Sequence, residues 1–273
     1  MSKVFVVDLG MCNGCHNCQV ACKDEHCEQP WLPYAAAQPM VGQFWMNVVQ
    51  RERGQVPTVR VSYIPTFCNH CADAPCTDVC PAGAIVRRED GLTYIDPKLC
   101  TGCGNCVDAC PIGAVYFNEE DHIAQKCTGC AHLLDNGWEV PRCVDACPTE
   151  AIRYIEESEA ADVIAGATQF EELEGRGSKV YYLKFPKRFV AGLVADFAAG
   201  EVVIGAKATL KDADGAVIAT QETDDFGDFI FDQIEPAAYT VDIEADGYEG
   251  ITVLADVTDI DVRIPDIDLK RIA

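Results

Sequence analysis

The sequence predicts an α+β fold in two unlike parts, and two observations support this prediction. All 17 cysteines lie between Cys12 and Cys147, in a region where strand-like runs lead into cysteine-rich loops. The C-terminal stretch has no cysteine and alternates apolar with polar residues between tight turns, as antiparallel strands do. Because 273 residues suffice for two domains of ordinary size, we expect a cysteine-rich domain at 1–155, a linker and docking segment at 156–198, and a β-domain at 199–273.

The cysteine-rich region contains one motif four times. Each copy has two cysteines separated by two residues, then a third cysteine, and a fourth that follows the third after three residues; in the last three copies a proline comes next. The copies are Cys12, Cys15, Cys18 and Cys22; Cys68, Cys71, Cys76 and Cys80; Cys100, Cys103, Cys106 and Cys110; and Cys127, Cys130, Cys143 and Cys147. Only Cys27 falls outside them. We expect it to be a small packed residue, with an extra ligand or a redox thiol as the alternative.

The spacing of these motifs favours iron–sulfur clusters. Three thiolates at short intervals hold one cluster in a loop, while the fourth ligates another cluster in two-cluster ferredoxins. Zinc sites instead pair one Cys-x2-Cys with another or with histidines, and disulfide frameworks belong to small secreted domains. Strand-like runs flank the loops as in bacterial ferredoxins, at 4–9, 59–64, 92–96 and 114–118. We therefore expect a tandem bacterial-ferredoxin-like domain with four 4Fe–4S clusters, and zinc or disulfides as the lesser alternatives.

The composition argues against nucleic-acid and membrane partners. Lys and Arg number 21 against 44 Asp and Glu, a formal charge of −23, whereas phosphate backbones and anionic lipids need a basic face. The start, MSKVFVVDLG, has neither the long apolar segment nor the cleavage site of a signal peptide. No apolar run is long enough to span a bilayer. We expect the protein to be cytoplasmic, or exported while bound to a signal-bearing partner.

The cysteine-free region predicts six short strands. The strand-like runs lie at 202–210, 216–223, 229–234, 239–245, 251–257 and 262–267. Turn sequences such as DADG and DDFG separate them, which favours a small antiparallel sandwich or barrel. The phrase TDDFGDFIFDQIEPAAYTVDIEADGY resembles the regulatory-like β-domains of the carboxypeptidase and transthyretin type. This resemblance implies a packing or interaction module, without catalytic residues.

The order of the four motifs resembles that of the iron–sulfur, electron-transfer subunits of the dimethyl-sulfoxide-reductase family of molybdopterin oxidoreductases. The phrases CNHCADAPCTDVCPAGAI and CTGCAHLLDNGWEVPRCVDACPTEAI carry the likeness. The resemblance implies a molybdopterin with Mo or W in a separate catalytic subunit, which would form a heterodimer, or a multiple of one, with this chain. It also implies which cysteines share a cluster: Cys12, Cys15 and Cys18 with Cys147; Cys127, Cys130 and Cys143 with Cys22; Cys68, Cys71 and Cys76 with Cys110; and Cys100, Cys103 and Cys106 with Cys80.

A closer likeness is to the small subunit of pyrogallol–phloroglucinol transhydroxylase and to the molybdenum-dependent catechol dehydroxylases. The phrases FWMNVVQRERGQVP and KCTGCAHLLD and the appended β-domain carry it. The transhydroxylase type lacks most of the third motif, whereas Cys80, Cys100, Cys103 and Cys106 are all present here.

A complete set of clusters implies net electron transfer. We therefore expect a non-catalytic subunit that relays electrons from a further donor to a chain that reductively dehydroxylates a catechol-type phenol. The alternatives are a stand-alone, or hydrogenase- or formate-linked, polyferredoxin and a structural small subunit of a transhydroxylase.

Five side chains within or beside the motifs are candidates for tuning the clusters. His16, His70 and His132 would donate hydrogen bonds to cluster sulfurs, or else pack in the loops. Lys126 and Arg142 directly precede motif cysteines, where each would offset negative charge or remain solvated.

Overall fold

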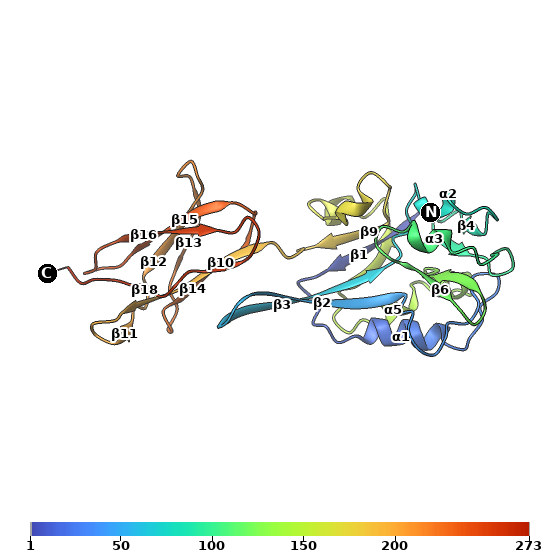
Figure 1. Ribbon diagram of the computed structural model, residues 1–273, viewed down its shortest axis with the longest axis horizontal. Helices are drawn as coiled ribbons and strands as arrows, with labels where there is room; N and C mark the ends of the chain where they lie inside the picture. Colours follow the sequence, from blue (N-terminus) through green and yellow to red (C-terminus); the bar gives the residue numbers. More distant parts are fainter. Residues whose placement is uncertain (1, 273) are drawn as a thin grey trace. The chain divides into compact units, whose positions relative to one another are not determined.

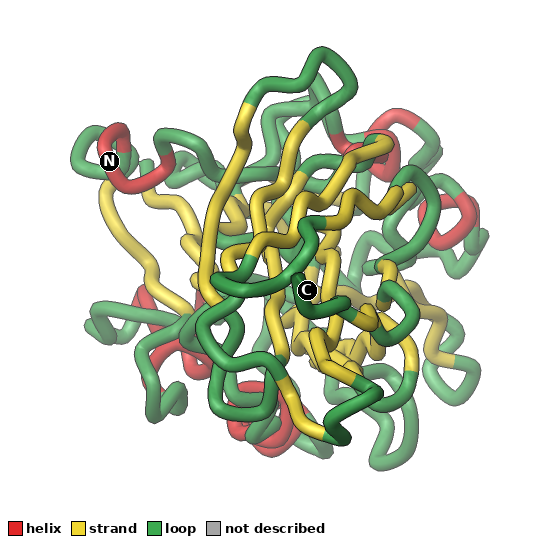
Figure 2. The backbone as a smooth tube through the Cα atoms, turned by 90° about the vertical axis from the view of Figure 1, so that its left-hand side faces the viewer, coloured by secondary structure: helices red, strands yellow, loops and turns green. Residues whose placement is uncertain are grey.

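The computed structural model describes residues 2–272, which form two compact units. The cysteine unit contains residues 2–50 and 62–185, and the β-unit contains residues 51–61 and 186–272. Strands make up most of the regular structure and the helices are short (Figure 2). This mixture of elements agrees with the predicted α+β class.

A three-stranded sheet lies at the centre of the cysteine unit. Its order is β8–β1–β9, with β1 antiparallel to β8 and parallel to β9 (Figure 1). The strands are β1 Lys3–Asp8, β8 Ile152–Glu156 and β9 Val180–Leu183. The β1 residues Val4, Phe5, Val6 and Val7 are almost completely buried, because this central strand is covered on both faces. The sheet thereby ties the start of the chain to the segments that follow the last cysteine motif.

Hairpins and short helices frame the cysteine loops. The hairpins pair β2 Met46–Gln55 with β3 Thr58–Phe67, β4 Ile85–Arg87 with β5 Thr93–Ile95, and β6 Val115–Asn118 with β7 Ile123–Lys126. The helices are α1 Asn17–His26, α2 Pro75–Asp78, α3 Asn105–Asp108, α4 Ala131–Asp135, α5 Arg142–Asp145 and α6 Ala161–Ile164, with a 3₁₀ turn η1 at Glu171–Leu173. A Cys-Pro pair follows α2, α3 and α5 within three residues and ends each after a single turn, since the residue before proline disfavours the helical conformation. None of the helices within residues 2–272 has both the length and the apolar character that crossing a bilayer requires.

The β-unit consists of two sheets that pack face to face. One has the order β11–β10–β14, with β17 and β18 also paired to β10, and the other has the order β13–β12–β15–β16 (Figure 1). The strands are β10 Arg188–Asp196, β11 Glu201–Val202, β12 Lys207–Lys211, β13 Val217–Glu222, β14 Asp228–Ile234, β15 Ala238–Glu244, β16 Ile251–Asp256, β17 Val262–Arg263 and β18 Ile267–Asp268. Side chains of both sheets fill one core, in which Leu210, Val241 and Ile243 are fully buried. Burying each such side chain contributes about 1.5–3 kcal/mol.

Two segments belong to units other than those the sequence indicates. Residues 51–61, the tip of the β2–β3 hairpin, fall in the β-unit, although the sequence places them within 1–155. Residues 188–196, assigned from the sequence to the linker, form β10, the longest strand of the β-unit. The alternation that marks a half-exposed strand is absent from β10, because nearly all of its residues are buried. The boundaries at 155 and 199 otherwise stay predictions.

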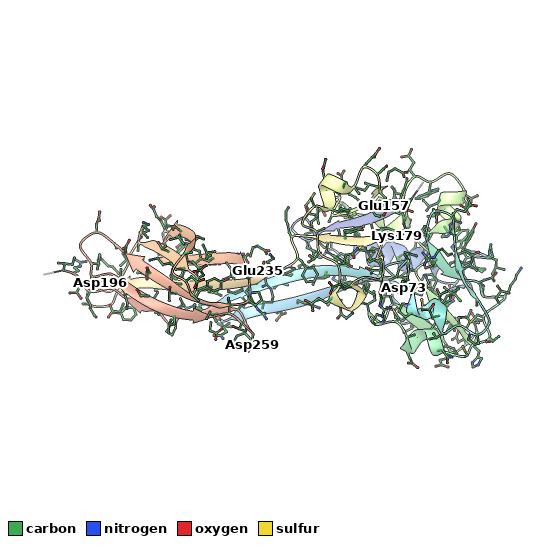
Figure 3. The ribbon with its side chains drawn as sticks, turned by 90° about the horizontal axis from the view of Figure 1, so that it is seen from above. Asp73, Glu157, Lys179, Asp196, Glu235 and Asp259 are labelled. Atoms are coloured by element: carbon green, nitrogen blue, oxygen red, sulfur yellow. The ribbon has the colours of Figure 1, made fainter. Side chains whose placement is uncertain are left out.

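Ion pairs lie at both ends of the β-unit. Asp196, at the end of β10, accepts a hydrogen bond from Arg271 Nε at 2.8 Å. Glu235, in the turn after β14, pairs with Lys187 just before β10 begins. Figure 3 shows Asp196 and Glu235 at opposite ends of the unit. Each pair lies beside one end of β10, the longest strand of the unit.

Candidate functional site

The four cysteine motifs share one local structure. A strand ends shortly before the first cysteine of each motif, and the third cysteine lies in a short helix. The strands are β1, β3, β5 and β7, and the helices are α1, α2, α3 and α5. Strand and helix thus hold the first three cysteines of each motif around one loop.

The loops also share a left-handed backbone at matching positions. The residue before the second cysteine has a φ of 70° at Gly14, 47° at His70, 70° at Gly102 and 64° at Gly129. Glycine adopts this conformation without strain. His70 adopts it at a steric cost of the kind that persists where function requires it. The repeat in the sequence is therefore a repeat in backbone structure.

The first group of cysteines combines motif one with the end of motif four. Cys12, Cys15, Cys18 and Cys147 lie close enough for their charges to interact. Burial, followed by the charges of Cys12 and Cys147, raises the pKa of Cys18 to about 12. Such thiols hold their protons until a metal displaces them, so metal binding here releases protons.

The second group is the most deeply buried. It contains Cys22, Cys127, Cys130 and Cys143. Burial and then the neighbouring sulfurs hold the pKa of Cys22 and of Cys143 well above the usual value. The pKa of Cys127 rises to about 11 and that of Cys130 to about 12, in both cases chiefly because of burial. Four thiols in this position require a cation to become thiolates.

The third group surrounds a cavity. Cys68, Cys71, Cys76 and Cys110 all line it. Burial, and then the charges of the three other sulfurs, raises the pKa of Cys71 to about 11. All four cysteines that the resemblance assigns to this group therefore contribute a thiol to the lining of one cavity.

The fourth group resembles the first in its exposure, with one buried, two intermediate and one exposed cysteine. Burial and then the charges of Cys100, Cys76 and Cys80 raise the pKa of Cys106 to about 11. Cys103 is exposed, and its assignment to this group comes from the motif spacing. The structure thus brings together every motif cysteine except Cys103 in the sets that the family resemblance implies.

Electrostatic effects between neighbouring groups indicate that the four follow one another in a row. Cys18 acts on Cys143, Cys68 on Cys127, and Cys76 on Cys106. These pairs join the first group to the second, the second to the third, and the third to the fourth. Cys15 and Cys103, the exposed cysteines of the chain, belong to the groups at the two ends.

The donors around the sulfurs suit iron–sulfur clusters. Backbone N–H groups donate to Sγ atoms at 3.3–3.4 Å, from Ala84 to Cys80, from Ala114 to Cys110, from Ala124 to Cys100 and from Gly129 to Cys127. Hydrogen bonds to sulfur stabilise thiolate ligands and tune cluster potentials. All 17 cysteines are free thiols. Within residues 2–272, no three potential ligands converge as a single metal ion would need. The four sulfurs that line one cavity in the third group suit a multi-iron cluster, whose ligands are thiolates.

Comparison with known proteins adds an independent line of support. Residues 59–157 match the family model of a 4Fe–4S dicluster domain, and residues 190–270 match that of a carboxypeptidase regulatory-like domain. The chain is 39% identical over 265 residues to the pyrogallol hydroxytransferase small subunit of Pelobacter acidigallici, covering 92% of this chain and 94% of that protein. It is 42% identical over 133 residues to a tetrathionate reductase subunit of Salmonella typhimurium, and 37% identical over 134 residues to a subunit of the anaerobic dimethyl sulfoxide reductase of Escherichia coli. This protein belongs to the iron–sulfur subunits of the dimethyl-sulfoxide-reductase family of molybdopterin oxidoreductases.

The reductase relatives resemble only part of this iron–sulfur subunit. Each of these two matches covers 49% of the chain, and they cover 50% and 63% of the respective reductase subunits. The pyrogallol hydroxytransferase small subunit is similar over nearly the whole chain. The 4Fe–4S character and the carboxypeptidase-regulatory-like character predicted for the two regions are confirmed.

His70 is the histidine of this subunit that is best placed to serve a cluster. Its Nδ1 accepts a hydrogen bond from the Thr93 backbone N–H at 3.0 Å, which leaves the ring proton on Nε2. Within the described residues, Nε2 is buried and has no partner. Burial, and then the charge of Lys126, holds the pKa of His70 well below its usual value, so the ring is neutral. A buried N–H without a partner beside Cys68 and Cys71 fits a sulfur acceptor in the cluster held there.

The other two predicted histidines have protein partners. His132 Nε2 lies 3.0 Å from Glu25 Oε1, and its ring stacks on Trp31 at 4.4 Å between centroids. His16 Nδ1 lies 3.2 Å from Gln19 Oε1. These contacts favour the packing alternative for both residues.

The sequence analysis missed His26. Its Nε2 lies 4.0 Å from Cys130 Sγ, and its side chain is buried. The available signal was helical periodicity, because His26 follows Cys22 by four residues on α1 and so shares its face.

The two predicted cations differ in their surroundings. Lys126 is 2% exposed and its ammonium lies 3.3 Å from Cys68 Sγ. Arg142 is half-buried and pairs with Asp145 at 2.6 Å and with Glu25 at 3.8 Å. Of the two, only Lys126 is a buried charge that has no carboxylate partner among the described residues.

Proposed function

We propose that this subunit relays single electrons through four 4Fe–4S clusters to a molybdopterin-containing catalytic subunit, in a heterodimer or a multiple of one. The observation that carries the proposal is the row of four cysteine groups whose end groups contain the exposed Cys15 and Cys103. Bound 4Fe–4S clusters supply reversible one-electron chemistry at irons held by thiolates. The membership in a family of iron–sulfur subunits supports the relay role.

Sixteen cysteines would hold the four clusters. The proposed ligand sets are Cys12, Cys15, Cys18 and Cys147; Cys22, Cys127, Cys130 and Cys143; Cys68, Cys71, Cys76 and Cys110; and Cys80, Cys100, Cys103 and Cys106. Mutual electrostatic influence between the sulfurs of each set supports the assignment, with Cys103 added from the spacing alone. Cys27 lies outside all four sets.

The burial of the cysteines differs between the middle and the ends of the row of four groups. Burial of Cys22, Cys130 and Cys143 keeps water away from the middle. Exposure of Cys15 and Cys103 leaves the ends accessible to other proteins. One end would face the catalytic subunit and the other a separate electron donor.

A phenol of the catechol type is the proposed substrate of the complex. Reductive removal of a hydroxyl group consumes two electrons and two protons and releases water. Transfer of a hydroxyl group between two phenols consumes no net electrons. Similarity to a pyrogallol hydroxytransferase small subunit supports a phenolic substrate, and the complete third motif, together with Cys80, supports a net supply of electrons.

A second candidate is a structural small subunit of a transhydroxylase. The observation that favours it is the same end-to-end similarity, 39% identity over 92% of the chain. In that case the clusters would hold the fold together and carry no current during turnover.

One experiment separates these functions. The native complex is purified anaerobically, its clusters are reduced with dithionite, excess reductant is removed, and catechol or pyrogallol is added while the EPR signals of the reduced clusters are recorded. The relay predicts that a substrate which the complex converts reoxidises the clusters at the rate of turnover. Clusters that stay reduced during conversion would support the structural role. Purification without a molybdopterin chain would support a polyferredoxin.

A further inference from the structure

The structure contains a buried cation between the second and third cysteine groups. Lys126 ends β7, and its side chain is 2% exposed. Its Nζ donates hydrogen bonds to the backbone oxygen of Thr93 at 2.6 Å, to Thr93 Oγ1 at 2.9 Å and to the backbone oxygen of Cys127 at 3.2 Å. The fourth contact is to Cys68 Sγ at 3.3 Å. The ammonium therefore touches a ligand of the third group and the backbone of a ligand of the second.

This charge has no conventional counter-ion. Within residues 2–272, no carboxylate lies within ion-pair distance of Lys126. A buried ammonium without an anion is strongly destabilising. The available negative charge is that of the thiolates and clusters on its two sides. Its Nζ lies 3.3 Å from Cys68 Sγ in the third group and 3.2 Å from the backbone oxygen of Cys127 in the second, so its charge acts on both groups.

We propose that the Lys126 ammonium is the shared counter-charge of the two central clusters and raises the reduction potential of both. The inference rests on the proposed function, because it requires clusters at the second and third groups. Adding an electron to a cluster makes it one charge more negative, and a fixed positive charge stabilises that form. Lys126 is thus a positioning residue that acts through cluster ligands.

The position of Lys126 between the second and third groups explains how its charge would assist electron transfer. Cys68 of the third group and Cys127 of the second both lie next to the ammonium. In a region closed to water, an electron on either cluster would repel an electron on the other. The ammonium lies at that junction and offsets the repulsion. Thr93 fixes it there, since the same residue also donates its N–H to His70.

Arg142 offers a matched control. It directly precedes Cys143 of the second group, just as Lys126 precedes Cys127. Its guanidinium is half-buried and already pairs with Asp145 and Glu25. At Cys130 its charge is outweighed by the opposite charge of Glu25, whereas Lys126 has no such opposing carboxylate among the described residues.

The test is an EPR-monitored redox titration of the anaerobic native complex, with iron content measured in parallel. The variants are Lys126→Gln, Lys126→Arg and Arg142→Gln. We expect Lys126→Gln to retain iron and to disfavour reduction of two of the four clusters about tenfold or more each, which is about 59 mV or more for a one-electron couple. Lys126→Arg keeps the positive charge. Its reduction equilibria should stay within about threefold of those of the wild type, and the same holds for Arg142→Gln.

Each outcome has a distinct meaning. Unchanged potentials in an iron-replete Lys126→Gln complex would overturn the inference and leave the proposed function intact. A wild-type complex without iron would instead refute the proposed function. If Lys126→Gln does not retain iron, Lys126→Met replaces it, because it removes the charge and keeps an unbranched side chain. Lower potentials for two of the four clusters in Lys126→Met would support the inference, and unchanged potentials would overturn it.

Discussion

The Nε2 atom of His26 lies 4.0 Å from Cys130 Sγ, although 104 residues separate the two along the chain. Burial, and then the proximity of His132, lowers the pKa of His26 to about 3. The ring is therefore neutral, and it packs against Trp45 with 4.7 Å between the ring centroids. With its ring proton on Nε2, this neutral group would donate to the sulfur and stabilise negative charge on it.

We expect His26→Leu to lower the reduction potential of one cluster, the one proposed for the second group. The shift should reach up to about 59 mV, a tenfold change in the reduction equilibrium, because one hydrogen bond to a charged acceptor is lost. EPR-monitored titration measures it. His132→Phe is the matched control, since it keeps an aromatic ring against Trp31 and should leave all four potentials in place. A His26→Leu complex with wild-type potentials would show that the contact has no electronic role.

Gly102 tests the link between loop geometry and cluster binding. A Cβ at this position would lie 2.3 Å from the backbone oxygen of His122, and φ is +70°. Gly113 has φ of +61° but no atom within 4 Å of its Cβ position. We expect Gly102→Ala to lose the cluster of the fourth group, about four irons per chain. Gly113→Ala should retain all iron and cost about 1–2 kcal/mol of stability through backbone strain. Equal iron content in the two variants would contradict the prediction.

Arg53 and Asp261 form a buried ion pair within the β-unit, at 3.2 Å. Asp261 is almost completely buried and also accepts a hydrogen bond from the Phe189 N–H at 2.9 Å. Arg53→Met should lower the free energy of unfolding of this unit by about 3–5 kcal/mol, because it leaves a buried carboxylate unpaired. Asp261→Asn in the same chain should restore part of that loss. Amide hydrogen exchange in β10 and β14 measures both, and strictly additive losses would argue against the pairing.

Asp196 predicts a pH dependence of the β-unit. The N–H of Ala199 and then the guanidinium of Arg271 hold the pKa of Asp196 below its usual value. As pH falls through the ordinary value of about 4, the unfolded state takes up the proton first. The stabilising contribution is therefore complete above about pH 4 and is lost as pH falls further, through the lowered pKa of the folded state.

The matched variant for this prediction is Asp196→Asn. It should unfold at a lower temperature than the wild type at pH 7, and the difference should shrink as the pH falls below about 4. Loss of the NMR amide signals of β10 on heating reports the transition. A difference that stays constant between about pH 6 and pH 3 would mean that Asp196 contributes nothing through its charge.

The cluster-binding loops could be predicted from the sequence because their determinants are local. The intervals between cysteines, the Cys-Pro pairs and glycines such as Gly102 specify the loops within short segments, the longest of which is 127–147. Strands such as β15 show alternation because one of their faces is buried and the other is partly exposed. β10 shows none because it is buried on both faces.

The remaining features depend on contacts between distant residues. Lys126 is buried because Thr93 and Cys68, 33 and 58 residues away, meet its ammonium. Nothing in the neighbouring sequence separates it from a solvated lysine. Arg53 reaches Asp261 across 208 residues, so the FWMNVVQRERGQVP phrase could suggest a family but not that its tip packs in the β-unit.

Metal analysis of the natively purified, anaerobic complex tests the central claim most directly. The account predicts about 16 irons in this chain, as four 4Fe–4S clusters, with molybdenum or tungsten in a co-purifying catalytic chain whose own iron is counted separately. Iron without molybdenum or tungsten would contradict the proposed partner. Zinc in place of iron would contradict the assignment of the sixteen cysteines itself.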